Sequence, residues 1–418
     1  MTPTRRQFLR QSLAAGAALR TVLPVLPVGL PLGLGACSST DEAEADEPRR
    51  KILILGGTGF LGPALIDAVL ARGHRLTLFN SGRTEERRAE AGRDSVIPEG
   101  VEVLYGNRDP RLTADDRRLA GDPDIESKRD PNSPRGLTQL EGRRWDAVID
   151  TSGFFPRMVA ASAELLAPRV GQYVFISSIS VYAHNDVPGM DEDAELLTLE
   201  DPTVEEFGPN FENYGGGKAL CERAAEAAMP GRTTNVRPGY IVGPRDTSRR
   251  WSYWPWRAAQ GGEMAVPGAP TDPVQFIDVR DLAEWVVRCS LRRVVGAFNA
   301  TGPAAELSMR RMLEGCRAAA GTDVRFTWAD AEFLGERELS YPIWIAPEGE
   351  TAGFHRVSVA RAVAAGLTFR SVEETSRATL AWLDGLPADL RARVLPPFDR
   401  DKEAAALQAW RAAAAKPG

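Results

Sequence analysis

The sequence has few cysteines, histidines and lysines. Its 418 residues include four Cys, three His and five Lys, against 46 Arg. So few Cys and His residues exclude a disulfide-stapled fold and give no expectation of a metal site with several ligands. The formal net charge of −6 argues against a protein that binds nucleic acid by neutralising its phosphates. The remaining composition, 43% hydrophobic and 26% charged, is typical of a globular protein with a large core.

The first 36 residues predict an export signal rather than part of the fold. The run Thr4–Leu9 (TRRQFL) is similar to twin-arginine signals, and the apolar stretch after it contains an arginine and three prolines, which disfavour a spanning helix. The stretch ends in Leu-Gly-Ala-Cys37, which resembles a lipobox; the alternative is an unmodified cysteine in a cleaved signal. Residues 37–50 are small and acidic and predict a disordered tether. We therefore expect an extracytoplasmic protein, periplasmic or on the cell surface, held at the membrane by a lipid on Cys37.

A glycine-rich motif follows the first predicted strand. Residues 51–55 (KILIL) form a buried parallel strand in this interpretation, residues 63–72 a helix and residues 75–79 the next strand. Glycines at this spacing between a strand and a helix allow a tight turn and a close backbone approach to a pyrophosphate at the helix N-terminus. The motif predicts cofactor contacts at Gly56, Thr58, Gly59, Phe60, Leu61 and Gly62.

The end of the second strand bears on the choice of cofactor. An acidic residue there would bind the ribose 2′-hydroxyl of NAD, but this chain has Asn80, followed by Arg83. Without the carboxylate a 2′-phosphate is not repelled, and Arg83 could pair with it. NADP is therefore at least as good an expectation as NAD, unless Arg83 is only a solvated loop residue.

Strands and helices alternate along the next 130 residues, with strands predicted at 101–105, 145–150 and 172–177 and a polar surface insertion at 109–141. This alternation predicts an α/β fold, a Rossmann-type doubly wound parallel sheet with a smaller α+β C-terminal substrate domain. The expected boundaries are 51–240 for the cofactor domain, to which 276–300 return, 241–275 and 301–400 for the substrate domain, and 400–418 for a C-terminal helix and tail. Cys221, Cys289 and Cys316 are expected to be buried free thiols.

Two later segments have the residue types of a proton-transfer site. Serines follow the strand at 172–177, at the sheet edge where ligands of open α/β sheets bind. Tyr214 and Lys218 are four residues apart, hence on one face of a helix. A nearby ammonium is expected to lower the pKa of the phenol, which would make it a usable general acid or base.

The chain resembles an extended short-chain dehydrogenase/reductase of the NAD-dependent epimerase/dehydratase family. The matching segments, in the family's order, are GGTGFLG at 56–62, SSISVY at 177–182, YGGGK at 214–218, RPGYIVGP at 237–244 and FIDVRDLA at 276–283. The resemblance implies that Tyr214 is the acid/base, Lys218 its electrostatic partner and ribose anchor, and Ser178 the hydroxyl that polarises the substrate oxygen. It also implies that Pro238 lies beside the nicotinamide and Asn107 near the adenine.

Three features depart from the family pattern. Residues 150–153 (DTSG) replace its usual His-x-Ala-Ala stretch, and three glycines inside YGGGK weaken a helix by up to about 1 kcal/mol each. These glycines either allow a close approach of ligand or are loosely selected. Residues 185–213 contain ten acidic residues and no Lys or Arg, which indicates either a solvated loop or a lid that repels nucleotide-sugar diphosphates.

Three other sets of residues have structural and functional interpretations. Asp281 and Glu284 fit a helix capping pattern, so we expect them to be structural. The aromatic run at 251–256 (WSYWPW) is either core or the lining of a substrate pocket. His184 lies just past the serine strand and is a weaker candidate for the site.

The sequence therefore predicts an NAD(P)-dependent oxidoreductase of epimerase/dehydratase type, with Tyr214 as general acid/base and hydride transfer to and from a tightly held nicotinamide. A sugar-like or hydroxy-ketone small molecule is the expected substrate, and nucleic acid is not an expected partner. The alternatives are an NADPH-dependent carbonyl reductase and a non-catalytic nucleotide-binding protein on the same fold. Family members often dimerise through helices beside the Tyr–Lys helix, so a homodimer is also open.

Overall fold

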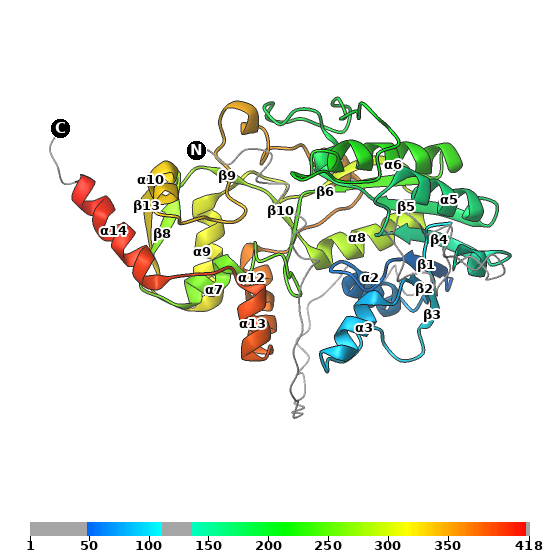
Figure 1. The fold of residues 1–418 in the computed structure, drawn as a ribbon, viewed down its shortest axis with the longest axis horizontal. Helices are drawn as coiled ribbons and strands as arrows, with labels where there is room; N and C mark the ends of the chain where they lie inside the picture. The colour runs from blue at the N-terminus through cyan, green and yellow to red at the C-terminus, as the bar shows by residue number, and fades with distance from the viewer. Residues whose placement is uncertain (1–47, 111–135, 415–418) are drawn as a thin grey trace.

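A computed structural model describes residues 48–110 and 136–414 of the chain (Figure 1). The twin-arginine run, Cys37 and the tether up to residue 47 lie outside the described residues, as does most of the expected insertion, 111–135. In the described part, no helix combines the length and apolar character needed to cross a membrane.

The larger unit of the molecule is built on a parallel sheet of seven strands in the order β11-β6-β5-β4-β1-β2-β3, which confirms the predicted fold class. Its central strands are apolar runs buried on both faces, as parallel sheets covered by helices require. The strands are β1 (Lys51–Leu55), β2 (Arg75–Asn80), β3 (Glu102–Tyr105), β4 (Trp145–Asp150), β5 (Val170–Ile176), β6 (Thr233–Pro238) and β11 (Gly296–Ala300).

Helices cover both faces of this sheet (Figure 1). Ile52 and Ile54 of β1 pack on the side of α2 (Gly62–Ala71) and α8 (Val279–Arg292). Leu53 and Leu55 point the other way, towards α5 (Pro156–Leu166) and α6 (Tyr214–Ala228). Shorter helical elements connect the strands: α3 (Arg83–Glu90), η4 (Gly136–Leu140) and η5 (Ile179–Val181).

A second, smaller unit holds most of the remaining elements, away from the large sheet (Figure 1). Three short strand pairs belong to it or join it to the sheet: β8 (Glu263–Pro267) with β13 (Arg325–Ala329), β7 (Tyr240–Val242) with β10 (Phe276–Asp278), and β9 (Pro273–Val274) with β12 (Leu307–Ser308). Its helices are α7 (Tyr253–Ala259), α9 (Met309–Ala320), α10 (Ala331–Glu336), η6 (Gly349–Thr351), α12 (Val372–Asp384), α13 (Ala388–Val394) and α14 (Arg400–Ala414). The short helix α11 (Ala360–Ala364), in contrast, packs beside β11 on the large sheet.

The core of this unit settles two of the open interpretations. Trp251 and Trp254 are completely buried, and their indole N–H groups donate to Thr379 and to the Pro342 carbonyl, so they are core rather than pocket lining. Asp278, not Asp281, is the N-cap of α8, because the helix begins three residues earlier than the capping pattern predicts.

Asp281 and Glu284 nevertheless have the structural role that the sequence predicts. The Asp281 carboxylate accepts the backbone N–H and the guanidinium of Arg370, and the same guanidinium reaches Glu284 at 2.7 Å. The three described cysteines, Cys221, Cys289 and Cys316, are buried free thiols, as expected.

Candidate functional site

The glycine-rich loop between β1 and α2 has the shape of a phosphate cradle. Gly56 has φ +89°, and a Cβ on Gly62 would lie 2.2 Å from the Gly57 carbonyl oxygen, so both positions require glycine. A Cβ on Gly59, in contrast, would meet no atom within 4 Å. The loop backbone is thus tightly packed against the protein at Gly62, whereas the space next to Gly59 is free of atoms of the described residues. An open backbone at a helix N-terminus fits the pyrophosphate of a dinucleotide. Thr58 and Phe60 flank this opening, whereas the Leu61 side chain packs into the core.

Asn80, at the end of β2, is part of this loop's support. Its side-chain oxygen accepts the Gly57 N–H at 2.8 Å. Its amide nitrogen is buried and has no hydrogen-bond partner among the described residues. An unused donor at this strand end suits a ribose hydroxyl and a 2′-phosphate alike, so Asn80 fits a nicotinamide nucleotide without selecting NAD or NADP. Arg83 is exposed on the first turn of α3.

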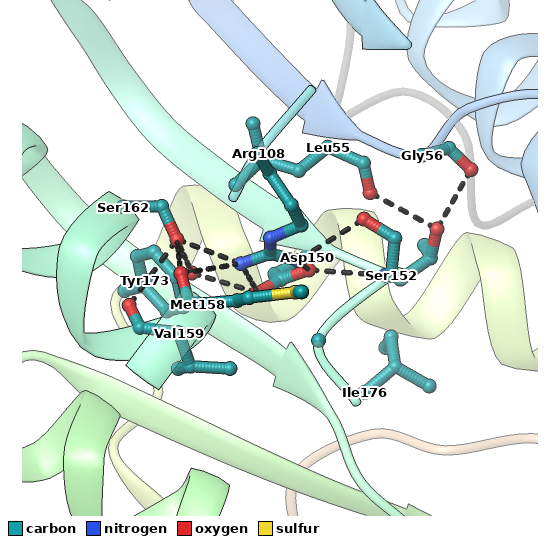
Figure 2. Close-up of polar contacts among 12 residues, drawn as sticks. Leu55, Gly56, Arg108, Asp150, Ser152, Met158, Val159, Ser162, Tyr173 and Ile176 are labelled. Carbon is teal, nitrogen blue, oxygen red and sulfur yellow. Dashed lines mark hydrogen bonds and ion pairs between the residues drawn. The ribbon is translucent and has the colours of Figure 1, made fainter. Parts of the chain in front are cut away.

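A buried ion pair lies between this loop and α5, and sequence reasoning missed it. Asp150, fully buried at the end of β4, is held by Arg108 at 2.5 and 2.7 Å and accepts the Tyr173 hydroxyl at 2.8 Å. Figure 2 shows the Arg108 side chain between Asp150, Ser152 and Ser162, whose hydroxyls also accept from it. Burial raises the pKa of Asp150, but the Arg108 cation and the hydrogen bonds from Arg108, Tyr173 and the Ser152 N–H together outweigh this effect and lower the pKa overall. The carboxylate is therefore charged and structural.

The residue after Asp150 connects this cluster to the glycine loop. The Thr151 hydroxyl lies 2.8 Å from the Gly56 carbonyl oxygen and 3.1 Å from that of Leu55. A Cβ on Gly56 would meet Thr151 and Ser152 closer than 3 Å. The DTSG segment, which departs from the family pattern, thus braces the phosphate loop from the neighbouring strand.

Lys218 is buried under the opposite side of the same edge. Its ammonium donates to the backbone carbonyls of Gly153 at 2.8 Å and Ile176 at 2.7 Å, and lies 4.2 Å from the centre of the Phe175 ring. Burial lowers the pKa of Lys218 to about 8. The two carbonyls fix the ammonium at the ends of β4 and β5 and leave one of its three donors for a ligand.

Ser178 lies beside Tyr214 and lowers the pKa of its phenol. Burial raises the pKa of Tyr214, and this effect exceeds the lowering by Ser178 and by the cation of Arg250. The expected lowering of this pKa by Lys218 is therefore wrong for this structure, because the ammonium is directed to backbone carbonyls. The structure does bring Ser178, Tyr214 and Lys218 to one sheet edge, as the motif predicts.

The glycines of YGGGK have a packing reason. A Cβ on Gly215 would lie 2.1 Å from the Ser180 carbonyl oxygen, and one on Gly216 2.5 Å from the Leu199 side chain. The start of α6 thus approaches the serine turn and the acidic segment closely. The backbone contact requires glycine at Gly215, whereas at Gly216 the added Cβ would meet the flexible end of the Leu199 side chain.

The acidic segment 185–213 is partly built into the fold. Glu192 is buried and accepts the Asn299 N–H at 2.8 Å, and Glu205 forms two bonds of 2.7 Å with Arg157. Phe207 packs edge-on against Tyr214, with ring centres 5.7 Å apart. The segment is therefore not a solvated loop alone, because its Phe207 covers one side of the Tyr214 ring.

The remaining candidates are placed around this edge. The side-chain oxygen of Asn107 accepts the Asp109 N–H at 3.0 Å, and Pro238 ends β6 opposite Ala300. His184 has a 66% exposed side chain 3.8 Å from Glu195, which places it on the surface. Within residues 48–110 and 136–414, no cluster of three His, Cys, Asp or Glu could hold a metal ion.

Comparison with known proteins agrees with this fold. Residues 151–299 match the sequence model of the NAD dependent epimerase/dehydratase family. The chloroplast stem-loop binding protein of 41 kDa b of Arabidopsis thaliana is 27% identical over 235 residues, 56% of this chain and 53% of that protein, so the chain matches about half the length of this relative. The epimerase family protein SDR39U1 of Bos taurus is 26% identical over 263 residues, 61% of this chain and 75% of that protein.

Solved structures share the fold at low identity. A UDP-glucose 4-epimerase superposes with a TM-score of 0.54 at 15% identity, covering 81% of this chain and 98% of the other. The UDP-glucuronic acid 4-epimerase of Bacillus cereus, in complex with NAD, gives 0.50 at 13% identity, with 79% and 98% covered. These likenesses show a Rossmann-type fold.

Proposed function

We propose that this protein is an NAD(P)-dependent oxidoreductase of epimerase/dehydratase type that acts on a sugar-like or hydroxy-ketone substrate. The observation that carries the proposal is the Tyr214–Ser178 contact beside the fixed ammonium of Lys218, at the sheet edge where the glycine loop is open at Gly59. Proton transfer and phosphate binding thereby share one edge, as an oxidoreductase of this fold requires.

Each residue has a distinct part in the proposed reaction. Ser178 positions the substrate oxygen next to the Tyr214 hydroxyl, and Tyr214 takes up and returns the proton of that oxygen. Lys218 holds the ribose with its remaining donor. A bound nicotinamide supplies hydride exchange at the substrate carbon. Because burial raises the pKa of Tyr214, the phenol is protonated in the cofactor-free protein and loses its proton only within the assembled site.

The proposed location favours chemistry that regenerates its own cofactor. We propose export by the twin-arginine route, which carries folded proteins, and a lipid on Cys37. Outside the cytoplasm no pool of free cofactor is expected, so the nucleotide would be carried in during folding. Hydride would then leave and return to the same substrate, as in epimerisation or internal elimination.

The first test is to purify the chain by gel filtration, denature it, and identify any released nucleotide by mass. The proposal expects about one NAD or NADP per chain, retained through the column. An empty protein that binds neither cofactor on titration would overturn it. Tyr214→Phe serves as the matched variant: it should retain the nucleotide yet lose activity by a factor of about 10² to 10⁴.

A second candidate has one specific observation in its favour: the relative from Arabidopsis thaliana is named as a stem-loop binding protein. A non-catalytic protein on this fold would bind an RNA hairpin whether or not Tyr214 is replaced. The carbonyl-reductase alternative is distinguished from an epimerase by NADPH absorbance. A reductase would oxidise added NADPH with small carbonyl substrates, whereas an epimerase gives no net change in NADPH absorbance.

A further inference from the structure

The amino-terminal edge of the large sheet, opposite the candidate site, is rich in cations. Since the seven strands are parallel, all of them begin at this edge. Five of the seven begin on a basic residue or directly after one: Lys51 in β1, Arg75 in β2, Arg144 before β4, Arg169 before β5 and Arg232 before β6. This repetition places positive charge along most of the edge.

A hollow of about 580 Å³ lies at the β1–β2–β4 end of this edge. Five cationic side chains line it: Arg49, Lys51, Arg75, Arg143 and Arg144. Of the lining residues that the structure describes, Glu102 is the one carboxylate, and it pairs with Arg143 at 2.9 Å. No ion pair with another described residue compensates the other four cations, so the hollow carries a net positive charge.

The basic surface continues beyond the hollow. The Arg169 guanidinium donates to the Gly142 carbonyl, and that of Arg232 to the carbonyls of Ala167 and Val170. Carbonyl acceptors fix these side chains but leave their charge uncompensated. This concentration of cations stands in a chain whose net charge is −6. The acidic segment 185–213 lies at the other edge, beside Tyr214, so the molecule has a basic end and an acidic end.

The chain also enters the fold at the basic end, because Arg49 and Arg50 lead directly into β1. Only ten residues lie between position 37 and position 48, and the eleven steps of the chain from one to the other reach at most about 40 Å when extended. A lipid on Cys37 would therefore hold the basic edge close to the membrane surface.

We propose that the basic amino-terminal edge of the sheet binds the anionic headgroups of a phospholipid surface and turns the candidate active site away from it. The inference rests on the proposed export and lipid anchor for the presence of that surface. Cations next to an anionic leaflet gain free energy within a Debye length of it. Trp145, the one aromatic residue among those described around the hollow, is buried and bonded to Thr77, so the hollow lacks the stacking platform typical of single-stranded nucleic-acid sites.

The test compares full-length chains that carry Cys37→Ser, so that no acyl group contributes. Sedimentation with vesicles is measured for phosphatidylcholine alone and for phosphatidylcholine mixed with phosphatidylglycerol. We expect binding that needs phosphatidylglycerol and falls at high salt. Arg75→Gln/Arg144→Gln should weaken it by about tenfold or more, since each cation near the surface contributes about fivefold.

Arg310→Gln/Arg311→Gln is the matched control, because it removes the same charge from the exposed side of α9 in the smaller unit. Equal binding of the protein to both vesicle types would overturn the inference, and so would an equal loss of vesicle binding in the control variant. Binding to an RNA hairpin in place of vesicles would also overturn it. The same holds if the protein bound no vesicles until the acidic side chains at 41–47 were neutralised by substitution. Nucleotide content is measured on the same samples and should stay constant. A failure of lipid binding is thereby distinguished from a failure of the proposed oxidoreductase function.

Discussion

The Arg108–Asp150 pair shows how a single buried contact supports the candidate site. Removing the cation leaves a carboxylate that is fully buried and uncompensated. We expect Arg108→Met to destabilise the protein by about 3–5 kcal/mol, and Arg108→Met/Asp150→Asn to recover part of that loss. Urea unfolding measures both. Arg143→Gln, which breaks the exposed pair with Glu102, should change stability by at most about 1 kcal/mol; an equal effect of Arg108→Met would contradict the structure.

Lys218 gives a prediction about pH. Its pKa is about 8 in the folded protein against 10.5 for the ordinary side chain. Between these pH values the unfolded chain holds a proton that the folded one has lost, so this group makes stability rise with pH across the window. Lys218→Met cannot titrate and should lack this rise, which amounts to about 3 kcal/mol at 1.36 kcal/mol per pKa unit. Urea unfolding from pH 8 to pH 10.5 measures the difference, with Lys51→Met as an exposed control that keeps the rise.

At the scale of elements, different glycines of the strand–loop–helix unit from β1 to α2 are expected to serve protein stability and cofactor binding. A methyl group on Gly62 collides with the Gly57 carbonyl oxygen, whereas one on Gly59 enters open space. Gly62→Ala should therefore destabilise the fold by about 3 kcal/mol, because α2 has to move away from the loop. Gly59→Ala should leave stability within about 1 kcal/mol and still lose the nucleotide, since the methyl group occupies the space of the pyrophosphate.

Thermal unfolding and the amount of nucleotide that copurifies measure the two effects. The assignment of the loop as the cofactor site would be wrong if Gly59→Ala retained a full complement of nucleotide.

The elements that the sequence predicts well are those with a clear apolar pattern. The predicted strand at 145–150 coincides with β4, and the C-terminal helix predicted within 400–418 begins at the same residue as α14. The helix α3 (RTEERRAE) was missed because it has no apolar face, and its charged residues read as a loop. The role of Asp150 was missed for another reason. Its partner Arg108 is 42 residues away, and only the order of the strands brings the two together.

At the scale of the whole molecule, the smaller unit depends on a second buried ion pair. Arg257 of α7 and Glu403 of α14 are both buried and joined by bonds of 3.0 and 2.5 Å, and Glu403 also accepts the Ala265 N–H of β8. This contact attaches the C-terminal helix to the β8–β13 pair. It is far in sequence from the glycine loop, and none of the cofactor candidates belongs to these elements.

Glu403→Gln should therefore destabilise the smaller unit without emptying the cofactor site. Loss of the carboxylate leaves the Arg257 cation buried and unpaired, which costs about 3–5 kcal/mol. Glu338→Gln, at the exposed pair with Lys402 on the same helix, should change stability by less than about 1 kcal/mol. In urea, Glu403→Gln should lose the tryptophan fluorescence of the buried Trp251 and Trp254 before it releases nucleotide, whereas the control loses both together. If both signals moved together in Glu403→Gln as well, the two units would unfold as one, and the smaller unit could not be altered independently of the candidate cofactor site.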